Sequence, residues 1–252
     1  MTIDHRPSSI VNPSMILHPD RILFEDNHLI IINKKPGEIV QSDITGDVPL
    51  SECVKKFLKE KYSKPGNVYL GTVHRIDRPV SGIVIFAKTT KALSRMNEML
   101  RERTLLKTYW AVVSSRPPEK SGQLKLYLTK NKEQNKSYVS EKKVAGSLLS
   151  ELDYKIKFMT FQLYLLEVHP LTGRPHQIRS MLSHIGCPIK GDVKYGAKYS
   201  NPDGSICLHS REAKFFHPVN KNEIHITAPP PDDELWNFFE NQVMKSFNEK
   251  KP

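Results

Sequence analysis

GTVHRIDRPVSGIVIFAK, residues 71–88, is the stretch that decides the fold of this chain. Residues 83–87 form a continuous apolar run of the length expected for a buried strand. Pro79 interrupts regular pairing just before that strand, because proline fixes φ and has no N–H to donate. Asp77 therefore lies on a loop that leads directly into the core. It is a candidate catalytic carboxylate, and the alternative is a structural ion pair with a neighbouring arginine.

The residues around Asp77 exclude one enzyme class that uses a loop aspartate and disfavour another. In the kinase catalytic loop, H-R-D-x-x-x-x-N, arginine directly precedes aspartate, but here Ile76 separates Arg75 from Asp77. The chain also has no glycine-rich phosphate loop and no D-F-G. A glycoside hydrolase needs two opposed carboxylates, and Asp77 has no obvious partner in its motif, so this class ranks last.

The chain carries a large excess of positive charge, with 38 Lys and Arg against 27 Asp and Glu and a formal net charge of +11. Such an excess favours a polyanionic partner, with RNA or DNA ahead of a membrane. The alternative is a surface charge that serves only solubility. With 38% apolar residues among 252, the chain can still bury a sizeable core.

The cysteines indicate a reducing compartment, because three of them (Cys53, Cys187 and Cys207) do not make a disulfide framework. A zinc site formed with His184 and His209 is the alternative, but its spacing differs from the usual paired knuckles. We therefore expect buried thiols and no metal site. No apolar run has the length of a membrane span, and the N-terminus lacks the apolar region of a signal peptide. A cytoplasmic protein is expected.

Hydrophobic periodicity predicts an alternation of strands and helices. Strands are expected over residues 22–24, 29–32, 83–87, 105–114, 124–128, 148–158, 161–168, 206–216 and 224–228. Helices are expected over 52–62 with Ser51 as cap, after Thr89 or Thr90, before Ile185 with Gly186 as the stop, and over 232–243. Residues 130–143, with five lysines, are expected to form a loop. That loop either is merely solvated or contacts phosphates, and the sequence favours neither.

The order His74-Arg75-Ile76-Asp77-Arg78, followed by Ser81-Gly82, resembles the H-R-L-D-R-x-T-S-G signature of the RluA-type RNA pseudouridine synthases. Val80 stands where the family usually has threonine. Other segments resemble the same family in the same order: N-K-K-P-G at 33–37, K-T-Y-W-A at 107–111, G-R-P-H-Q-I-R at 173–179, and C-P-I-K-G-D with Y-G at 187–196. The resemblance covers roughly four-fifths of the chain.

The resemblance implies an α/β fold of the α+β type, in which helices flank a long, bent, mixed and mostly antiparallel sheet. One catalytic domain is expected over 20–243, between an N-terminal arm at 1–19 and a tail at 244–252. The arm is too short for the RNA-binding domain that precedes the catalytic domain in many relatives. The implied activity is isomerisation of specific uridines in structured ribosomal or transfer RNA, by a monomer without cofactor or metal. The alternative is a non-catalytic RNA-binding protein that retains the fold.

The resemblance also assigns residues to the site. Asp77 is the catalytic carboxylate, acting covalently or as a base on the sugar, and can be reset after each turnover. Tyr109 lies against the base and takes the C5 proton, and Arg179 pairs with the ionised aspartate. Arg75 either fills the gap left by the flipped uridine or forms a structural ion pair with a carboxylate elsewhere. RNA contact and base flipping are assigned to the remaining motif residues His74, Arg78, Lys107, Arg174 and His176.

Overall fold

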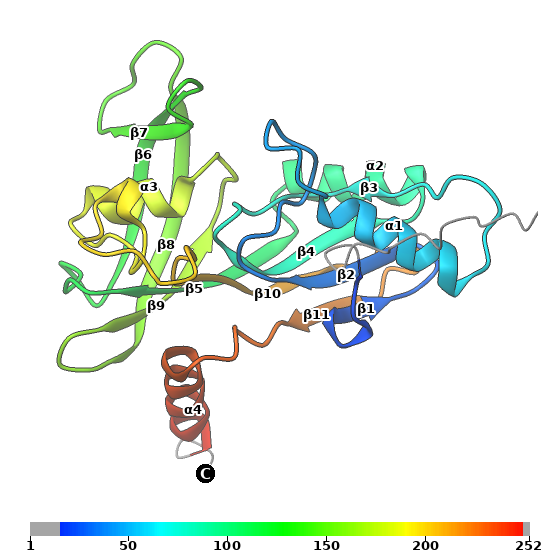
Figure 1. Ribbon diagram of the computed structural model, residues 1–252. Helices are drawn as coiled ribbons and strands as arrows, with labels where there is room; N and C mark the ends of the chain where they lie inside the picture. The colour runs from blue at the N-terminus through cyan, green and yellow to red at the C-terminus, as the bar shows by residue number, and fades with distance from the viewer. Residues whose placement is uncertain (1–15, 249–252) are drawn as a thin grey trace, which may run out of the picture.

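One long, bent sheet runs through the molecule, and helices pack on it (Figure 1). The computed structural model describes residues 16–248. The strands follow the order β1-β2-β4-β10-β5-β9-β8-β6-β7, with β11 paired to β10 and β3 to β4. Among these strands β4 and β10 pair in parallel, whereas the other pairs are antiparallel. The expected mixed, mostly antiparallel sheet is therefore confirmed.

The elements have the following bounds. The strands are β1 Ile22–Glu25, β2 Leu29–Lys34, β3 Gly71–Thr72, β4 Ser81–Ala87, β5 Leu106–Val113, β6 Ser121–Asn131, β7 Lys136–Ser140, β8 Leu148–Met159, β9 Tyr164–Pro170, β10 Leu208–Phe216 and β11 Glu223–Thr227. The helices are α1 Leu50–Lys61, α2 Thr90–Arg101, α3 Gln177–His184 and α4 Glu234–Asn248, with short 3-10 turns η2 Pro19–Arg21 and η3 Val193–Tyr195.

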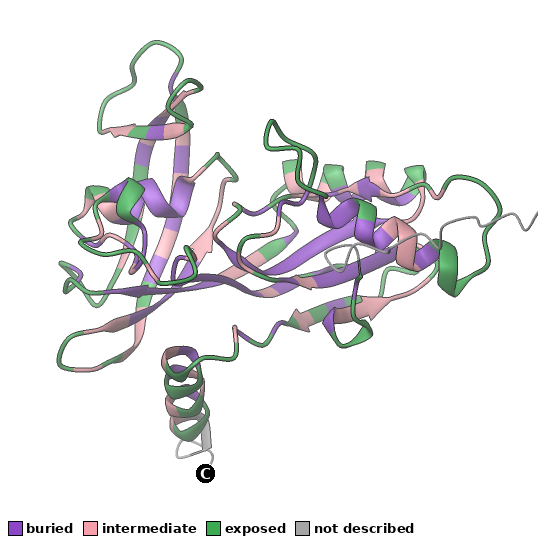
Figure 2. Ribbon diagram, viewed as in Figure 1, coloured by how far each residue is buried: buried purple, intermediate pink, exposed green. Residues whose placement is uncertain are grey.

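Strand β4 is buried along its whole length, as its apolar run predicts. Its side chains alternate between two cores, because successive residues of a strand point to opposite faces. Val84 and Phe86 join the core that α1 covers, whereas Ile83 and Ile85 join the core that α2 covers. Figure 2 shows this buried centre between exposed helix faces. A strand covered on both sides explains the missing polar alternation.

The start of one helix differs from the sequence expectation, and the start of another agrees with it. Helix α1 begins at Leu50, and Ser51 is a buried residue inside it that does not cap. The N–H groups of Leu50 and Ser51 donate instead to the carbonyls of Ile39 and Val40, so the loop before the helix replaces a side-chain cap. The cap of α2 is confirmed, because the Thr89 side chain accepts from the N–H of Ala92 at 3.2 Å.

The chain ends also differ from the expected arm and tail. Helix α4 continues to Asn248, so residues 244–248 extend the closing helix predicted over 232–243. Leu17, expected in the arm, is 5% exposed and packs into the core. Residues 1–15 of the arm and 249–252 of the tail lie outside the described residues.

Residues 130–143 include the turn and the second strand of the β6–β7 hairpin, and the expectation of a loop is wrong. Lys130 at the end of β6 lies opposite Ser137 on β7, and Leu128 lies opposite Val139. Ser137 is 3% exposed, and β7 packs against α3. Only Ser137 and Val139 of β7 point toward the core. Two inward residues among many lysines are too few to show the alternating pattern that predicts a strand.

The backbone conformation and the surroundings of residue 82, just after the Asp77 loop, require glycine. Gly82 has φ +107°, and a Cβ at this position would come within 2.3 Å of the carbonyl oxygen of Ser210 on β10. Residues with a side chain rarely adopt this φ, and a side chain would separate the parallel pair β4–β10. The glycine thus lets the strand after Asp77 approach the middle of the sheet.

Candidate active site

A buried lysine fixes the loop that carries Asp77 through hydrogen bonds to backbone carbonyls. Lys34, 1% exposed at the end of β2, donates through Nζ to the carbonyls of Lys35, Glu38 and Arg78. The Arg78 carbonyl also accepts from the Gly37 N–H at 2.9 Å. Three carbonyls satisfy the three donors of the ammonium group, so Lys34 fixes the backbone next to Asp77. The N-K-K-P-G segment predicted this loop but not a role for its lysine.

Arg179 joins Asp77 to a second carboxylate. Its Nη1 donates to Asp77 Oδ2 at 2.9 Å, while Nε and Nη2 donate to the two oxygens of Asp192 at 2.7 and 2.9 Å. Asp192 is 1% exposed. Burial lowers the pKa of Arg179, but the hydrogen bonds to Asp192 and the charge of Asp77 outweigh it and raise that pKa above its ordinary value. The guanidinium is thus a permanent cation aimed at Asp77.

The pairing of Arg179 with Asp77 agrees with the expectation, whereas the role of Asp192 was missed. Asp192 belongs to the C-P-I-K-G-D segment, but its sequence surroundings do not show which cation it binds. Its bidentate contact fixes the plane of the guanidinium. Asp192 is therefore a positioning residue for the Asp77 partner.

Tyr109 lies on β5 in the same pocket and is 7% exposed. Burial, together with the charge of Asp77, raises its pKa to about 12, against a hydrogen bond with Ser210 that lowers it. The phenol therefore keeps its proton at neutral pH. It presents a flat ring and a hydroxyl group to whatever enters the pocket.

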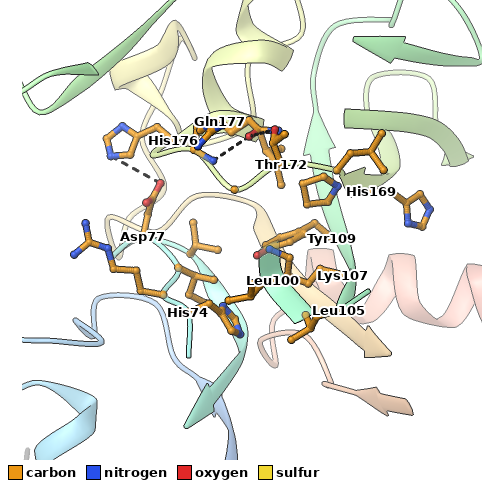
Figure 3. Close-up of a pocket in the computed structure, with 18 of the residues that line it drawn as sticks. His74, Asp77, Leu100, Leu105, Lys107, Tyr109, His169, Thr172, His176 and Gln177 are labelled. Atoms are coloured by element: carbon orange, nitrogen blue, oxygen red, sulfur yellow. Dashed lines mark hydrogen bonds and ion pairs between the residues drawn. The ribbon is translucent and has the colours of Figure 1, made fainter. Parts of the chain in front are cut away.

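The pocket has a volume of about 790 Å³, within the range of small-ligand sites. In Figure 3, Asp77 and His176 face each other at one end, and Tyr109 and Lys107 lie toward the other. The expected site residues that line it are His74, Arg75, Asp77, Lys107, Tyr109, Arg174, His176 and Arg179. Arg78 is not among the lining residues, because its guanidinium binds Asp47 and the Gly37 carbonyl.

The match to the model of the RNA pseudouridylate synthase family spans residues 28–184 of this chain. The chain belongs to this family. The ribosomal large subunit pseudouridine synthase C of Buchnera aphidicola subsp. Acyrthosiphon pisum (strain APS) is 36% identical over 214 residues, covering 82% of this chain and 66% of that protein. The protein of the same name from Pasteurella multocida (strain Pm70) is 32% identical over 232 residues, covering 90% and 69%. The chain thus spans about two thirds of the length of these curated relatives.

The fold agrees with solved members of this pseudouridylate synthase family. Human RNA Pseudouridylate Synthase Domain Containing 4 superposes with a TM-score of 0.73 at 21% identity, covering 88% of this chain and 93% of that one. Human RNA Pseudouridylate Synthase Domain Containing 1 gives 0.66 at 17%, covering 92% and 95%. At this identity the likeness concerns the fold alone.

Two further basic residues of this synthase-family pocket have no acidic partner within residues 16–248: His74 and Lys107. Burial lowers the pKa of His74 to about 3, with a smaller contribution from the charge of Lys107. Burial likewise lowers the pKa of Lys107. The His74 Nε2 atom is buried and has no hydrogen-bond partner among the described residues. A ligand with polar oxygens would satisfy both groups.

All three cysteines of this family member are buried, as expected. Within residues 16–248, no cluster of three or more His, Cys, Asp or Glu side chains has the arrangement of a metal site. None of the helices in that part of the chain combines the length and the apolar character needed to cross a membrane.

Proposed function

We propose that this protein isomerises specific uridines of RNA to pseudouridine, without a cofactor, and that Asp77 is the catalytic carboxylate. The observation that carries the proposal is the Arg179 guanidinium, which Asp192 holds in place and which binds Asp77 Oδ2 at 2.9 Å. A fixed cation keeps a carboxylate ionised and oriented in a partly dry pocket. The names of the curated relatives support ribosomal RNA as the substrate ahead of transfer RNA.

The reaction requires that uracil leave C1′, turn, and rejoin through C5. Asp77 would act on the sugar, either by attack on C1′ or as a base, and Arg179 would stabilise it in its ionised form. An enzyme that acts on a base takes it out of the stack, and exposed Arg75 at the pocket lining is placed to fill the space left behind. His74, Lys107 and Arg174 would then contact the base or its flanking phosphates.

Tyr109→Phe is expected to collapse turnover while RNA affinity stays nearly unchanged. We propose that Tyr109 lies against the uracil and that its hydroxyl oxygen takes the C5 proton. Because the pKa of Tyr109 is about 12, the phenol starts protonated and passes its own proton to a solvent water as it takes the one from C5. Phenylalanine keeps the ring for stacking and removes the oxygen. Single-turnover rates on RNA tritiated at uridine C5 measure the step, and a wild-type rate would exclude Tyr109 as the proton acceptor.

Charge reversal at the tip of the β6–β7 hairpin is expected to weaken RNA binding and to flatten its salt dependence. Burial lowers the pKa of Lys130, the charge of Asp77 raises it, and Lys194, Arg179 and Arg75 lower it further. Lys130 is one pair away from the turn, so the tip of the hairpin lies in the electrostatic field of the site. Lys132 and Lys136 lie at the same turn and add to its charge. For every phosphate that these lysines no longer neutralise, the log–log salt slope should fall by roughly 0.7–0.9.

A matched pair of variants tests this assignment. Lys132→Glu with Lys136→Glu alters the tip, whereas Lys142→Glu with Lys143→Glu makes the same charge change beyond the other end of β7. Binding to large-subunit ribosomal RNA is titrated at several salt concentrations. If both variants and the wild type show the same salt dependence of RNA affinity, the hairpin lysines do not contact RNA phosphates and are only solvated.

The decisive test of the function is tritium release from RNA labelled at uridine C5, followed by mapping of pseudouridine in cells with and without the gene. Release is expected from ribosomal RNA, and the mapped position should disappear in the deletion strain. If the wild-type protein binds RNA but releases no tritium from any cellular RNA, the non-catalytic RNA-binding protein becomes the better description.

A further inference from the structure

Two hydrogen bonds behind the site lead from the hairpin to His176, whose ring faces Asp77. The Ser137 N–H on β7 donates to the Tyr195 hydroxyl oxygen at 2.7 Å, and this hydroxyl lies 2.8 Å from His176 Nδ1. The other ring nitrogen, His176 Nε2, lies 3.9 Å from Asp77 Oδ2. Figure 3 shows the imidazole facing the carboxylate. None of these contacts is needed for the Asp77–Arg179 pair, so they call for another explanation.

The donors and acceptors around His176 favour one placement of the hydrogens. The Tyr195 oxygen already accepts from Ser137, which leaves its own hydrogen to donate to His176 Nδ1, 2.8 Å away. Nδ1 is then an acceptor, and a neutral imidazole must carry its hydrogen on Nε2. The nearby Asp77 oxygen favours the same arrangement, since an ionised carboxylate can only accept. The Nε2–H group therefore points at the space beside Asp77 Oδ2.

The imidazole is both neutral and held in an unfavourable backbone conformation. Burial, with Arg179, Lys130 and Lys194 adding to it and Asp77 opposing, lowers the pKa of His176 to about 4. His176 has φ +53° and ψ 24° at the start of α3, a left-handed conformation that is uncommon for residues with a side chain. Such strain is often retained where it aims a side chain into a functional site.

We propose that His176 is a catalytic residue whose Nε2–H donates a hydrogen bond to uracil O2 while the C1′–N1 bond breaks. This inference rests on the proposed function. When that bond breaks, its electron pair stays on the uracil and is shared between N1, O2 and O4. At the same time C1′ gains a bond to the Asp77 oxygen, or, when Asp77 instead removes the proton from C2′, a double bond to C2′. The proton stays on Nε2 throughout, so only the uracil, the ribose and Asp77 change their bonding. Tyr195 and Ser137 are positioning residues that fix the ring.

The distance from the carboxylate selects O2 as the acceptor. The carboxylate that acts on C1′ must lie beside it, and O2 is the uracil oxygen nearest to C1′, since only N1 and C2 separate them. A donor 3.9 Å from Asp77 Oδ2 can reach O2, whereas O4 lies on the far side of the ring. A fixed neutral donor at an oxygen that gains negative charge stabilises the transition state more than the ground state.

A pair of substitutions separates the two ring nitrogens. His176→Gln places an amide N–H near the position of Nε2, whereas His176→Asn reaches only the position of Nδ1 and retains the contact with Tyr195. Asparagine also tolerates the left-handed backbone, so its loss of activity would not reflect misfolding. In single turnover on C5-tritiated ribosomal RNA, we expect His176→Asn to lose about 10²–10³-fold in rate. His176→Gln should recover at least tenfold of this loss.

Two further measurements have readouts that a structural role would not move. Nitrogen NMR of the ¹⁵N-histidine protein should show His176 protonated at Nε2, with Tyr195→Phe disturbing this tautomer and slowing the chemical step without changing RNA affinity. Once the modified position is mapped, RNA with 2′-deoxyuridine at that position should respond to His176→Asn as strongly as all-ribose RNA does.

Three results would overturn the inference. They are an Nδ1-protonated ring, equal rates for the asparagine, glutamine and wild-type proteins, and a His176 effect that vanishes on the 2′-deoxy substrate, which would move the donor contact to the ribose hydroxyl. In each of these cases the wild-type protein is still active, so the proposed function would stand. An inactive wild type rejects the proposed function and this inference together.

Discussion

Asp77→Asn should abolish turnover while the fold and the binding of RNA survive. Asparagine is nearly isosteric, and its side-chain oxygen can still accept from Arg179 Nη1, which lies 2.9 Å from Asp77 Oδ2. It cannot readily attack C1′ or accept a proton from the sugar. Loss of the group that performs the chemistry commonly costs several orders of magnitude, so a rate below about one-thousandth of the wild type is expected in single turnover.

The comparison protein is Asp47→Asn, which removes one negative charge close to the same loop but outside the pocket. Asp47 pairs with Arg78, and both side chains are largely exposed, so the pair contributes little to stability. Near-wild-type activity is expected there. Tritium release, RNA binding and thermal unfolding are followed for both proteins. A folded Asp77→Asn protein that releases tritium at the wild-type rate would falsify the assignment of Asp77.

Replacement of Arg179 should harm both activity and stability. Arg179→Met would leave Asp192, which is 1% exposed, without the guanidinium that binds both of its oxygens. Removing one partner of such a buried pair typically costs about 3–5 kcal/mol. Arg179→Lys keeps the charge but loses the planar guanidinium, whose separate nitrogens bind Asp77 and both oxygens of Asp192. It should unfold at lower denaturant than the wild type and lose most of its activity.

Urea unfolding and single-turnover tritium release measure the two effects separately. Arg78→Lys is the matched control, because Arg78 lies next to Asp77 in sequence but is largely exposed. That change should alter neither quantity strongly. Wild-type activity in a stable Arg179→Lys protein would mean that another cation serves Asp77, with Lys130 the first candidate by its electrostatic coupling to this carboxylate.

Elements whose signal is local were predictable from the sequence. The apolar run 83–87 lies within β4, and the Thr89 cap begins α2 because a side-chain oxygen three residues before an N–H is a short-range arrangement. The motifs likewise identified Asp77, Tyr109 and Arg179 as members of one site. A local sequence pattern misleads where a segment from another part of the chain makes the contact instead. Ser51 was expected to cap α1, but the carbonyl of Val40 accepts its N–H and Ser51 lies inside the helix.

By itself, then, the sequence determined the central strand, the chemical types of the site residues and the family. Only the tertiary structure decided which of them meet. The Asp77–Arg179 contact joins residues 102 positions apart, and the partners of Asp192, Tyr195 and Lys34 follow from the strand order of the sheet. Periodicity reports which face of an element is buried, because burial repeats along the chain. The partner of a buried polar group is set by the segment that packs against it, and residues next to that group in the sequence carry no signal of this choice.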